Sequence, residues 1–214
     1  MVRLLGYNPA IFIRTKHSFE EVHYHLRKFI HLYKEETEKW YFFRFYDPQV
    51  LVAYLHHIEY DPMRLAAFFG FRNGECVIEH FAARIANRFY IFNLKELPPE
   101  TQPSAVTFDN EMERFLEEYD KRQLLEKLQT EIIPAEFPEQ KIAAADIDKY
   151  FNFALKRVFR HTEAIIDLVK AQIHLNDQEK LTQLIKQAEE EFGDNFPIIV
   201  ANTVYEQAKT ERKG

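Results

Sequence analysis

The spacing of hydrophobic residues changes along the chain and predicts a mixed N-terminal part followed by a helical one. Short apolar runs typical of β-strands occur at residues 10–13, 31–34, 39–46, 75–81 and 89–94. Hydrophobic residues at helical spacing occur at 19–30, 48–58, 63–69, 109–128, 147–158, 165–173, 181–192 and 197–208. We therefore expect an α+β fold, with an N-terminal α/β lobe built on a small mixed or antiparallel sheet and an all-helical C-terminal lobe.

Start and stop signals for helices stand at the ends of the first helical segments. Ser18 and Glu21 have the spacing of a capping box, in which each side chain satisfies a free backbone amide at a helix start. The pairs Asp47-Pro48 and Asp61-Pro62 combine a capping aspartate with a proline suited to the first turn. Gly70 can end the second of these helices in a left-handed conformation. Local chemistry thus predicts most helix ends of the N-terminal lobe.

Residues 39–46 form the strongest strand signal in the chain. They read Lys-Trp-Tyr-Phe-Phe-Arg-Phe-Tyr, so large aromatic residues occupy both alternating faces. The preceding run at 31–34 is expected to pair with this strand as a hairpin across the polar turn at 35–38. Because a strand with two apolar faces is normally covered on both sides, we expect residues 39–46 to lie in the middle of a sheet.

Arg44 interrupts this aromatic run with a charge. Strand alternation places it on the same face as Trp40, Phe42 and Tyr46. A buried guanidinium must find a carboxylate or carbonyl partner, because leaving it unpaired costs several kcal/mol. Two interpretations remain open. Arg44 either holds the strand-to-helix corner together by pairing with Asp47 or another acidic residue, or it presents its donors to a partner protein.

Composition and charge divide the chain at the proline-rich segment 97–104. Three prolines in eight residues remove amide donors and disfavour helix there, so we predict two lobes, residues 1–103 and 104–214. The first lobe carries 21 of the 32 aromatic residues and a formal charge of +1, whereas the second carries a formal charge of −7. The two lobes are therefore expected to have different roles.

The composition also excludes several classes of function. The five glycines are not spaced as in a dinucleotide fingerprint or a phosphate-binding loop, so we expect no nucleotide and no other cofactor. The single cysteine, Cys76, excludes an internal disulfide. A charge of +1 on the aromatic lobe is too weak to favour nucleic acid. Without a long apolar run or a signal peptide, the protein is expected to be soluble and cytoplasmic, with no membrane insertion.

Histidines of the first lobe are the main candidates for catalysis or metal binding. They are His23, His25, His56, His57 and His80. Imidazole is a common zinc ligand, but these residues lack the i, i+4 spacing of a helical metal pair. Cys76 lies in an apolar strand pattern, which favours a buried and inert thiol. We therefore expect no metal site, although a small hydrolase or metal-dependent enzyme that uses these histidines remains an alternative.

Residues 43–48 carry a resemblance to a known family. They read Phe-Arg-Phe-Tyr-Asp-Pro and are followed by Gln-Val-Leu and, at 68–70, by Phe-Phe-Gly. This pattern resembles the signature of type VI secretion adaptor proteins, also called effector chaperones (Tap or Tec), which were long catalogued only as a domain of unknown function. The helical segment from about 145 to 208 is similar to the C-terminal region of that family. The chain departs from the family pattern at Gln49, where arginine is common, and at Phe71, where proline is common.

The resemblance implies a bacterial cytosolic protein without catalytic activity, which binds a secreted toxic effector and loads it onto the trimeric spike protein (VgrG) of the secretion machine. We hypothesise that the aromatic lobe docks a partner near the strand-to-helix corner, because aromatic residues and arginine are the usual anchors of interfaces. The residues of the signature and of the expected contact are Trp40, Phe43, Arg44, Tyr46, Asp47, Pro48, Gln49, Tyr54 and Phe71. Two alternatives stay open: the run at 43–48 only holds the lobe together, or the protein is a general helical scaffold for protein interactions.

Overall fold

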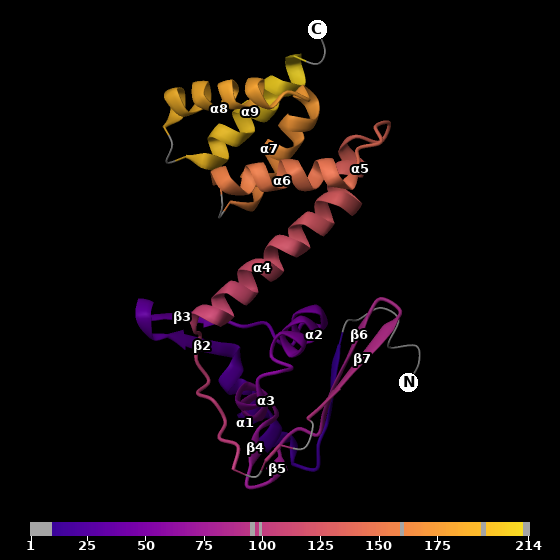
Figure 1. Cartoon of the computed structure of the whole chain (residues 1–214), viewed down its shortest axis with the longest axis vertical. Helices are drawn as coiled ribbons and strands as arrows, with labels where there is room; N and C mark the ends of the chain where they lie inside the picture. The colour runs from indigo at the N-terminus through magenta and orange to yellow at the C-terminus, as the bar shows by residue number, and fades with distance from the viewer. Residues whose placement is uncertain (1–9, 95–96, 99, 159–160, 194–195, 212–214) are drawn as a thin grey trace. The chain divides into compact units, whose positions relative to one another are not determined.

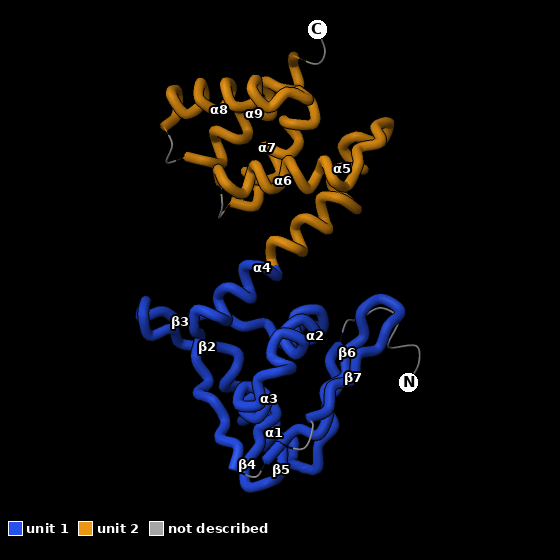
Figure 2. The backbone as a smooth tube through the Cα atoms, viewed as in Figure 1, with its two compact units in different colours: residues 1–119 blue, residues 120–214 orange. Residues whose placement is uncertain are grey.

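The chain forms two compact units, residues 1–119 and 120–214 (Figures 1 and 2). The computed structural model describes residues 10–94, 97–98, 100–158, 161–193 and 196–211. Unit 1 combines helices with small antiparallel sheets, and unit 2 is helical. The predicted α+β class is therefore confirmed.

The division between the units lies later in the chain than the proline-rich segment suggests. That segment predicts a boundary after residue 103, but the structural division follows Tyr119. Residues 104–119 belong to unit 1 because Phe108 and Met112 are buried in its core and Phe115 packs against it. A high proline content marks an irregular segment without showing where the next apolar residues pack.

The helices of unit 1 begin and end where the local signals predict. They are α1 (Phe19–Ile30), α2 (Pro48–His57), α3 (Pro62–Phe69) and the first part of α4 (Asn110–Lys127). The Ser18 hydroxyl accepts from the Glu21 amide, and the Glu21 carboxylate accepts from the Ser18 amide. Asp47 and Asp61 accept hydrogen bonds from amides in the first turns of α2 and α3. Gly70 ends α3 with a φ of 72°.

The strands of unit 1 pair antiparallel throughout the described residues. A sheet with the order β1-β6-β7 contains β1 (Ile11–Arg14), β6 (His80–Ile85) and β7 (Arg88–Asn93). The other described strands form two two-stranded sheets, in which β2 (His31–Lys34) pairs with β3 (Lys39–Phe42) and β4 (Phe71–Arg72) pairs with β5 (Glu75–Cys76). The expected hairpin of β2 and β3 is thus confirmed. Helix α2 packs against β6 and covers one face of the larger sheet (Figure 1).

Two strand predictions are wrong. The run at 39–46 is not a central strand, because β3 ends at Phe42 and pairs only with β2 among the described strands. The run at 75–81 divides between β5 and β6, which belong to different sheets. Both errors have one physical reason. Hydrophobic content shows that a segment favours a strand, but it does not show how many neighbouring strands or layers cover that segment.

Aromatic side chains form the centre of the unit 1 core. Phe68 is fully buried, and its ring centroid lies 5.0 Å from that of Phe29 and 4.9 Å from that of Phe81. The ring of Tyr54 lies 5.2 Å away in an edge-to-face arrangement. Such pairs add about 0.5–1.5 kcal/mol to the stabilisation from burial alone. Contacts between these rings pack α1, α2, α3 and β6 together in one core.

Unit 2 consists of helices around an apolar core. After α4 come the π-helical turn η3 (Leu128–Ile132), α5 (Ile133–Glu136), α6 (Ala144–Val158), α7 (Thr162–Leu175), α8 (Gln178–Phe192) and α9 (Pro197–Glu211). Helix α7 packs against α6, α8 and α9. Asp177 caps α8 and Pro197 begins α9, as their positions in the sequence predict. None of the described helices of the chain has the length and hydrophobicity needed to cross a lipid bilayer.

His25 makes the stability of unit 1 depend on pH. Its ring is buried, and its Nε2 donates to the Phe68 carbonyl over 2.9 Å. Burial lowers the pKa of His25 below its usual range; the hydrogen bond to Phe68 opposes this effect, and the charges of Lys28 and Arg72 add to it. The unfolded chain binds this proton near pH 6.5, and the folded chain binds it only at lower pH. The free energy of unfolding should therefore fall as the pH drops below about 6.5, by up to about 1.4 kcal/mol per pH unit.

Urea unfolding at pH 7.5 and pH 5.0 measures this loss, with His25→Gln as the variant that lacks the titrating group. All other ionisable groups are common to the natural chain and the variant, so the difference between the two proteins isolates His25. We expect the stability advantage of the natural chain over the variant to shrink at pH 5.0. A constant advantage at both pH values contradicts the expected effect of burial.

Candidate functional site

One face of the β2–β3 hairpin carries rings in directly opposed pairs. His31 lies opposite Phe42 and Tyr33 lies opposite Trp40, and opposed residues of an antiparallel pair share a face. The ring centroids are 5.3 Å apart in the first pair and 5.1 Å apart in the second. Tyr46 extends the row, with its ring 6.1 Å from that of Phe42. We call His31, Tyr33, Trp40, Phe42 and Tyr46 the aromatic surface.

The aromatic surface is open to solvent. Trp40 is 68% exposed, Phe42 is 52% exposed and Tyr46 is 46% exposed. Burying a large apolar side chain stabilises a protein or a complex by about 1.5–3 kcal/mol. Burial of these exposed rings by a partner would therefore contribute favourably to the free energy of binding. A single exposed ring is ordinary, but a contiguous group of them is typical of an interaction site. The arrangement therefore suits contact with an apolar patch of another molecule.

The opposite face of the hairpin fixes it to the core of unit 1. Leu32 is buried, and Tyr41 stacks on Phe108 with 4.0 Å between the ring centroids. The Lys34 ammonium donates to the Glu113 carboxylate over 2.6 Å, and this hydrogen bond raises the pKa of Lys34. Apolar and ionic contacts thus fix the hairpin to unit 1, and the aromatic surface lies on the opposite face of this fixed hairpin.

Arg44 lies at the surface of unit 1. Its side chain is 62% exposed, and its Nη2 is 3.5 Å from Oδ2 of Asp47. The expectation of a buried guanidinium is wrong, because β3 ends at Phe42 and the residues that follow alternate between core and solvent. The pairing with Asp47 is present, but an exposed ion pair contributes at most about 1 kcal/mol. Arg44 is therefore accessible to a partner.

Most of the other signature residues lie in the core. Three are buried packing residues: Phe43, Pro48 and Phe71. Tyr54 is buried as well, but it also lines a pocket. Asp47 caps α2 by accepting a hydrogen bond from the amide of Gln49, whose side chain is exposed. The signature thus divides into a structural part and a surface part, and the surface part consists of Trp40, Arg44, Tyr46 and Gln49.

Sequence reasoning did not single out three members of the aromatic surface, His31, Tyr33 and Phe42, as site residues. The signal that identifies them is the hairpin register. Pairing 31–34 with 39–42 across the intervening turn places His31 opposite Phe42 and Tyr33 opposite Trp40. Once the turn sets the register, side-chain alternation assigns each residue to a face. The aromatic surface can therefore be predicted from the hairpin register that the turn sets, but not from the aromatic run alone.

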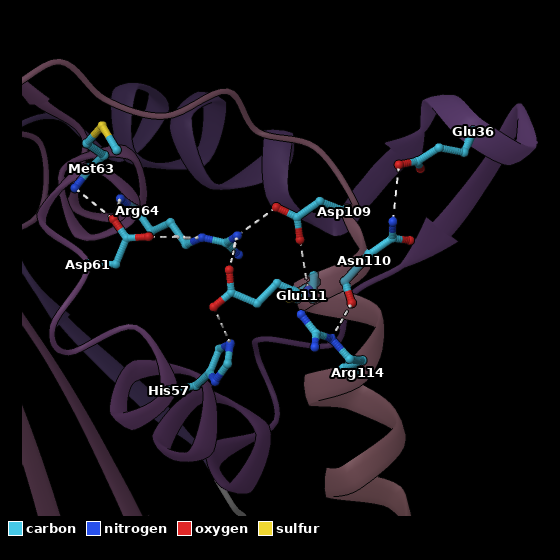
Figure 3. A network of polar contacts seen from close by, with 10 residues as sticks. Glu36, His57, Asp61, Met63, Arg64, Asp109, Asn110, Glu111 and Arg114 are labelled. Atoms are coloured by element: carbon cyan, nitrogen blue, oxygen red, sulfur yellow. Dashed lines mark hydrogen bonds and ion pairs between the residues drawn. The ribbon is translucent and has the colours of Figure 1, made fainter.

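A second site in unit 1 is polar and is centred on Arg64 (Figure 3). The Arg64 Nε lies 3.1 Å from the carboxylate of Asp61, in the same helix turn. Its Nη2 lies 2.6 Å from Asp109 and 2.7 Å from Glu111. Glu111 also contacts the His57 ring, with 3.5 Å between Oε1 and Nε2. This network joins α2, α3 and the start of α4, and three carboxylates in it share one guanidinium.

The candidate histidines and the cysteine are dispersed over unit 1. His23 stacks on Phe19, His56 packs near Phe92, and His80 contacts Asn93. His25 is in the core and His57 touches Glu111. Among the described residues, no three His, Cys, Asp or Glu side chains are placed to hold a metal ion. Burial raises the pKa of the half-buried Cys76 thiol, which disfavours the reactive thiolate.

Comparisons with known proteins bear on the N-terminal part of the chain. No curated protein and no solved structure matches the chain. A family model described as "Domain of unknown function (DUF4123)" matches residues 4–64. That range includes α1, the β2–β3 hairpin and α2, and with them the whole aromatic surface. The region that carries the candidate site is thus similar to this domain of unknown function.

Proposed function

We propose that the chain is a non-catalytic adaptor of type VI secretion, which binds a toxic effector in the bacterial cytosol and loads it onto the spike protein (VgrG). The aromatic surface is the observation that carries this proposal. It groups exposed rings on an anchored hairpin, and Trp, Tyr and Arg are the residues that most often dominate binding energy at protein interfaces.

The match to residues 4–64 supports the same proposal. It contains the run at 43–48, which resembles the signature of the type VI adaptors. Within that run Phe43 and Phe45 are buried, whereas Arg44 and Tyr46 are exposed. One short signature can therefore stabilise the corner with alternate side chains and present the others to a partner. The partner patch that best complements them is apolar and has a carboxylate that can reach Arg44.

Trp40→Ala is expected to weaken the complex at least about tenfold without unfolding the chain. Trp40 is 68% exposed, so its ring contributes little to the core. Truncation of a tryptophan anchor at an interface typically costs 2 kcal/mol or more of binding energy. The measurement is co-expression of the chain with a spike protein (VgrG) and a candidate effector from the same genome, followed by purification of the complex and calorimetric titration.

Tyr60→Ala is the matched control for this experiment. Tyr60 is 88% exposed, follows α2 and lies outside the aromatic surface, so its removal should leave the affinity unchanged. Arg44→Ala is a second test variant, expected to fold normally and to bind about threefold to tenfold more weakly. Equal affinities for Trp40→Ala and Tyr60→Ala, or failure of the chain to bind either co-expressed protein, contradict the proposal.

A further inference from the structure

A pocket in unit 1 lies beside the Arg64 network. Its volume is about 320 Å³. Ligand sites typically span about 300–1,000 Å³, so this pocket suits one side chain rather than a cofactor. Its floor consists of buried residues, which are Phe29, Leu32, Tyr54, Ala67 and Met112. Its exposed rim consists of Met63, Ala105 and Thr107. The pocket is open at the surface and apolar at depth.

The Tyr54 hydroxyl has no hydrogen-bond partner among the described residues. Tyr54 is only 6% exposed and lines the pocket. Burial raises the pKa of Tyr54 above its usual range, and nearby Arg64 opposes that rise. The charges of Asp109, Asp61 and Glu111 raise the pKa further, and Tyr54 lines the same pocket as Asp61, Arg64 and Asp109. Because the hydroxyl oxygen is not sealed from solvent and Tyr54 lines the pocket, the oxygen is open to the pocket and can accept a hydrogen bond from a ligand that enters it.

The charges around the pocket favour a cation. Asp61 and Asp109 line the pocket together with Arg64. The guanidinium of Arg64 is already matched by these two carboxylates and by Glu111, at distances of 2.6–3.1 Å. Three carboxylates against one guanidinium leave an excess of negative charge. A second cation near Asp61 and Asp109 would compensate that excess in a partly desolvated place, where charge pairing is stronger than in water.

We propose that this pocket, named here the Tyr54 pocket, binds a lysine or arginine side chain of a partner protein. The methylene stem lies along the apolar floor and past Met63, as long cationic side chains do on apolar surfaces. The cationic head donates to the Tyr54 hydroxyl oxygen and lies close to Asp61 and Asp109. That the side chain comes from a partner protein rests on the proposed adaptor function, whereas the preference for a cation rests on the pocket itself.

Other ligand classes fit the Tyr54 pocket less well. An anionic head meets the excess of carboxylates and is repelled. An uncharged apolar side chain fills the floor, but it leaves the Tyr54 hydroxyl without a partner and the negative charge uncompensated. The volume of about 320 Å³ and the exposed residues Ala105 and Thr107 suit entry of one side chain from a polypeptide that passes outside the pocket.

NMR titration of the full chain, labelled at its methionine methyl groups, tests the proposal without a partner protein. Met63 and Met112 line the pocket, so their signals report binding there. The cationic probes are N-acetyl-lysine N-methylamide and its arginine equivalent, and the matched probes are the norleucine and glutamate equivalents. We expect the cationic probes to shift both signals, with dissociation constants at least about tenfold lower than that of the norleucine probe. The glutamate probe should give no saturable shift.

Tyr54→Phe tests the role of the hydroxyl. It is expected to raise the dissociation constant of the lysine probe about threefold to tenfold, which is the effect of one hydrogen bond. The variant should unfold at the same or a higher urea concentration, because the hydroxyl bonds to no described residue of the folded chain. Tyr90→Phe is the matched control, since Tyr90 lies in β7 and does not line the pocket, and it should leave binding unchanged.

Three results overturn the proposal. They are equal binding of the norleucine and lysine probes, an unchanged dissociation constant in Tyr54→Phe, and binding of free n-butylamine without binding of the blocked lysine. None of these measurements involves the effector or the spike protein, so each leaves the adaptor proposal to its own test. Failure of the co-expressed proteins to bind, with the lysine probe still binding at Met63 and Met112, would instead remove the adaptor function and keep a cation-binding pocket.

Discussion

Gly70→Ala is expected to lower the free energy of unfolding by about 3 kcal/mol. Gly70 ends α3 with a φ of +72°, a region that costs an L-residue about 1–2 kcal/mol. An added β-carbon lies 2.9 Å from Cβ and Cγ2 of Val77 and 3.0 Å from Cε1 of His25. Packed neighbours must therefore move, which costs about a further 1–3 kcal/mol. Urea unfolding of the natural chain and of Gly70→Ala at pH 7.5 measures the sum of the backbone and packing costs.

Gly74→Ala separates the two causes of that loss. Gly74 has a φ of +84°, but apart from its chain neighbours no heavy atom of the described residues lies within 4 Å of an added β-carbon. Its substitution should therefore cost about 1 kcal/mol, from the backbone alone. The difference between the variants measures the contact of the new methyl group with Val77 and His25. Equal losses in Gly70→Ala and Gly74→Ala contradict the role given to that contact.

The helix ends of unit 1 were predictable because the chemistry that determines them is local. Asp61 accepts hydrogen bonds from the amides of Met63 and Arg64, which are two and three residues away. Gly70 provides its left-handed turn without help from distant residues. Such interactions depend on a few neighbouring residues, so their spacing in the sequence is sufficient to identify them.

The placement of the aromatic run was not predictable from the same kind of pattern. Residues 39–46 have the composition of a buried strand, yet Trp40 and Phe42 are exposed and Phe43 and Phe45 enter the core. What decides between these outcomes is whether another layer covers the hairpin, and that depends on residues far away in the chain. Among the described residues, Phe108 covers one side of the hairpin and the other side stays exposed, and Phe108 lies beyond the predicted lobe boundary at residue 103.

Residues far apart in the sequence also build the Arg64 network and the Tyr54 pocket. Asp61 and Arg64 lie within one helix turn, but Asp109 and Glu111 follow the proline-rich segment. Nothing local in the sequence shows that the start of α4 folds back onto α3. Tyr54 was singled out from the resemblance to the adaptor family, but its position at the pocket follows only from the packing of α2 against both elements.

Arg64→Leu is expected to lower the free energy of unfolding by about 2–3 kcal/mol. Removing one partner of a buried ion pair costs about 3–5 kcal/mol, because the remaining charge is left uncompensated. Arg64 is 17% exposed, but the carboxylates of Asp61, Asp109 and Glu111 are 35%, 43% and 50% exposed, so water partly solvates them and reduces the loss. Urea unfolding gives the difference between the natural chain and the variant.

Two matched variants show whether the charge or the packing of Arg64 is responsible. Arg64→Lys keeps the charge but loses the planar fork that reaches three carboxylates, so about half of the loss should remain. Arg27→Leu removes an exposed arginine of α1 and should change the stability by less than about 0.5 kcal/mol.

Salt gives an independent measurement of the same cause. Repulsion between the unmatched carboxylates of Asp61, Asp109 and Glu111 is screened at high ionic strength, because the Debye length falls to about 3 Å at 1 M salt. The deficit of Arg64→Leu relative to the natural chain should therefore shrink between 0.05 M and 1 M NaCl. The alternative is that Arg64 stabilises the α3–α4 contact through packing of its methylene stem and not through its charge. In that case the loss in free energy of unfolding is independent of salt and is equal in Arg64→Lys and Arg64→Leu.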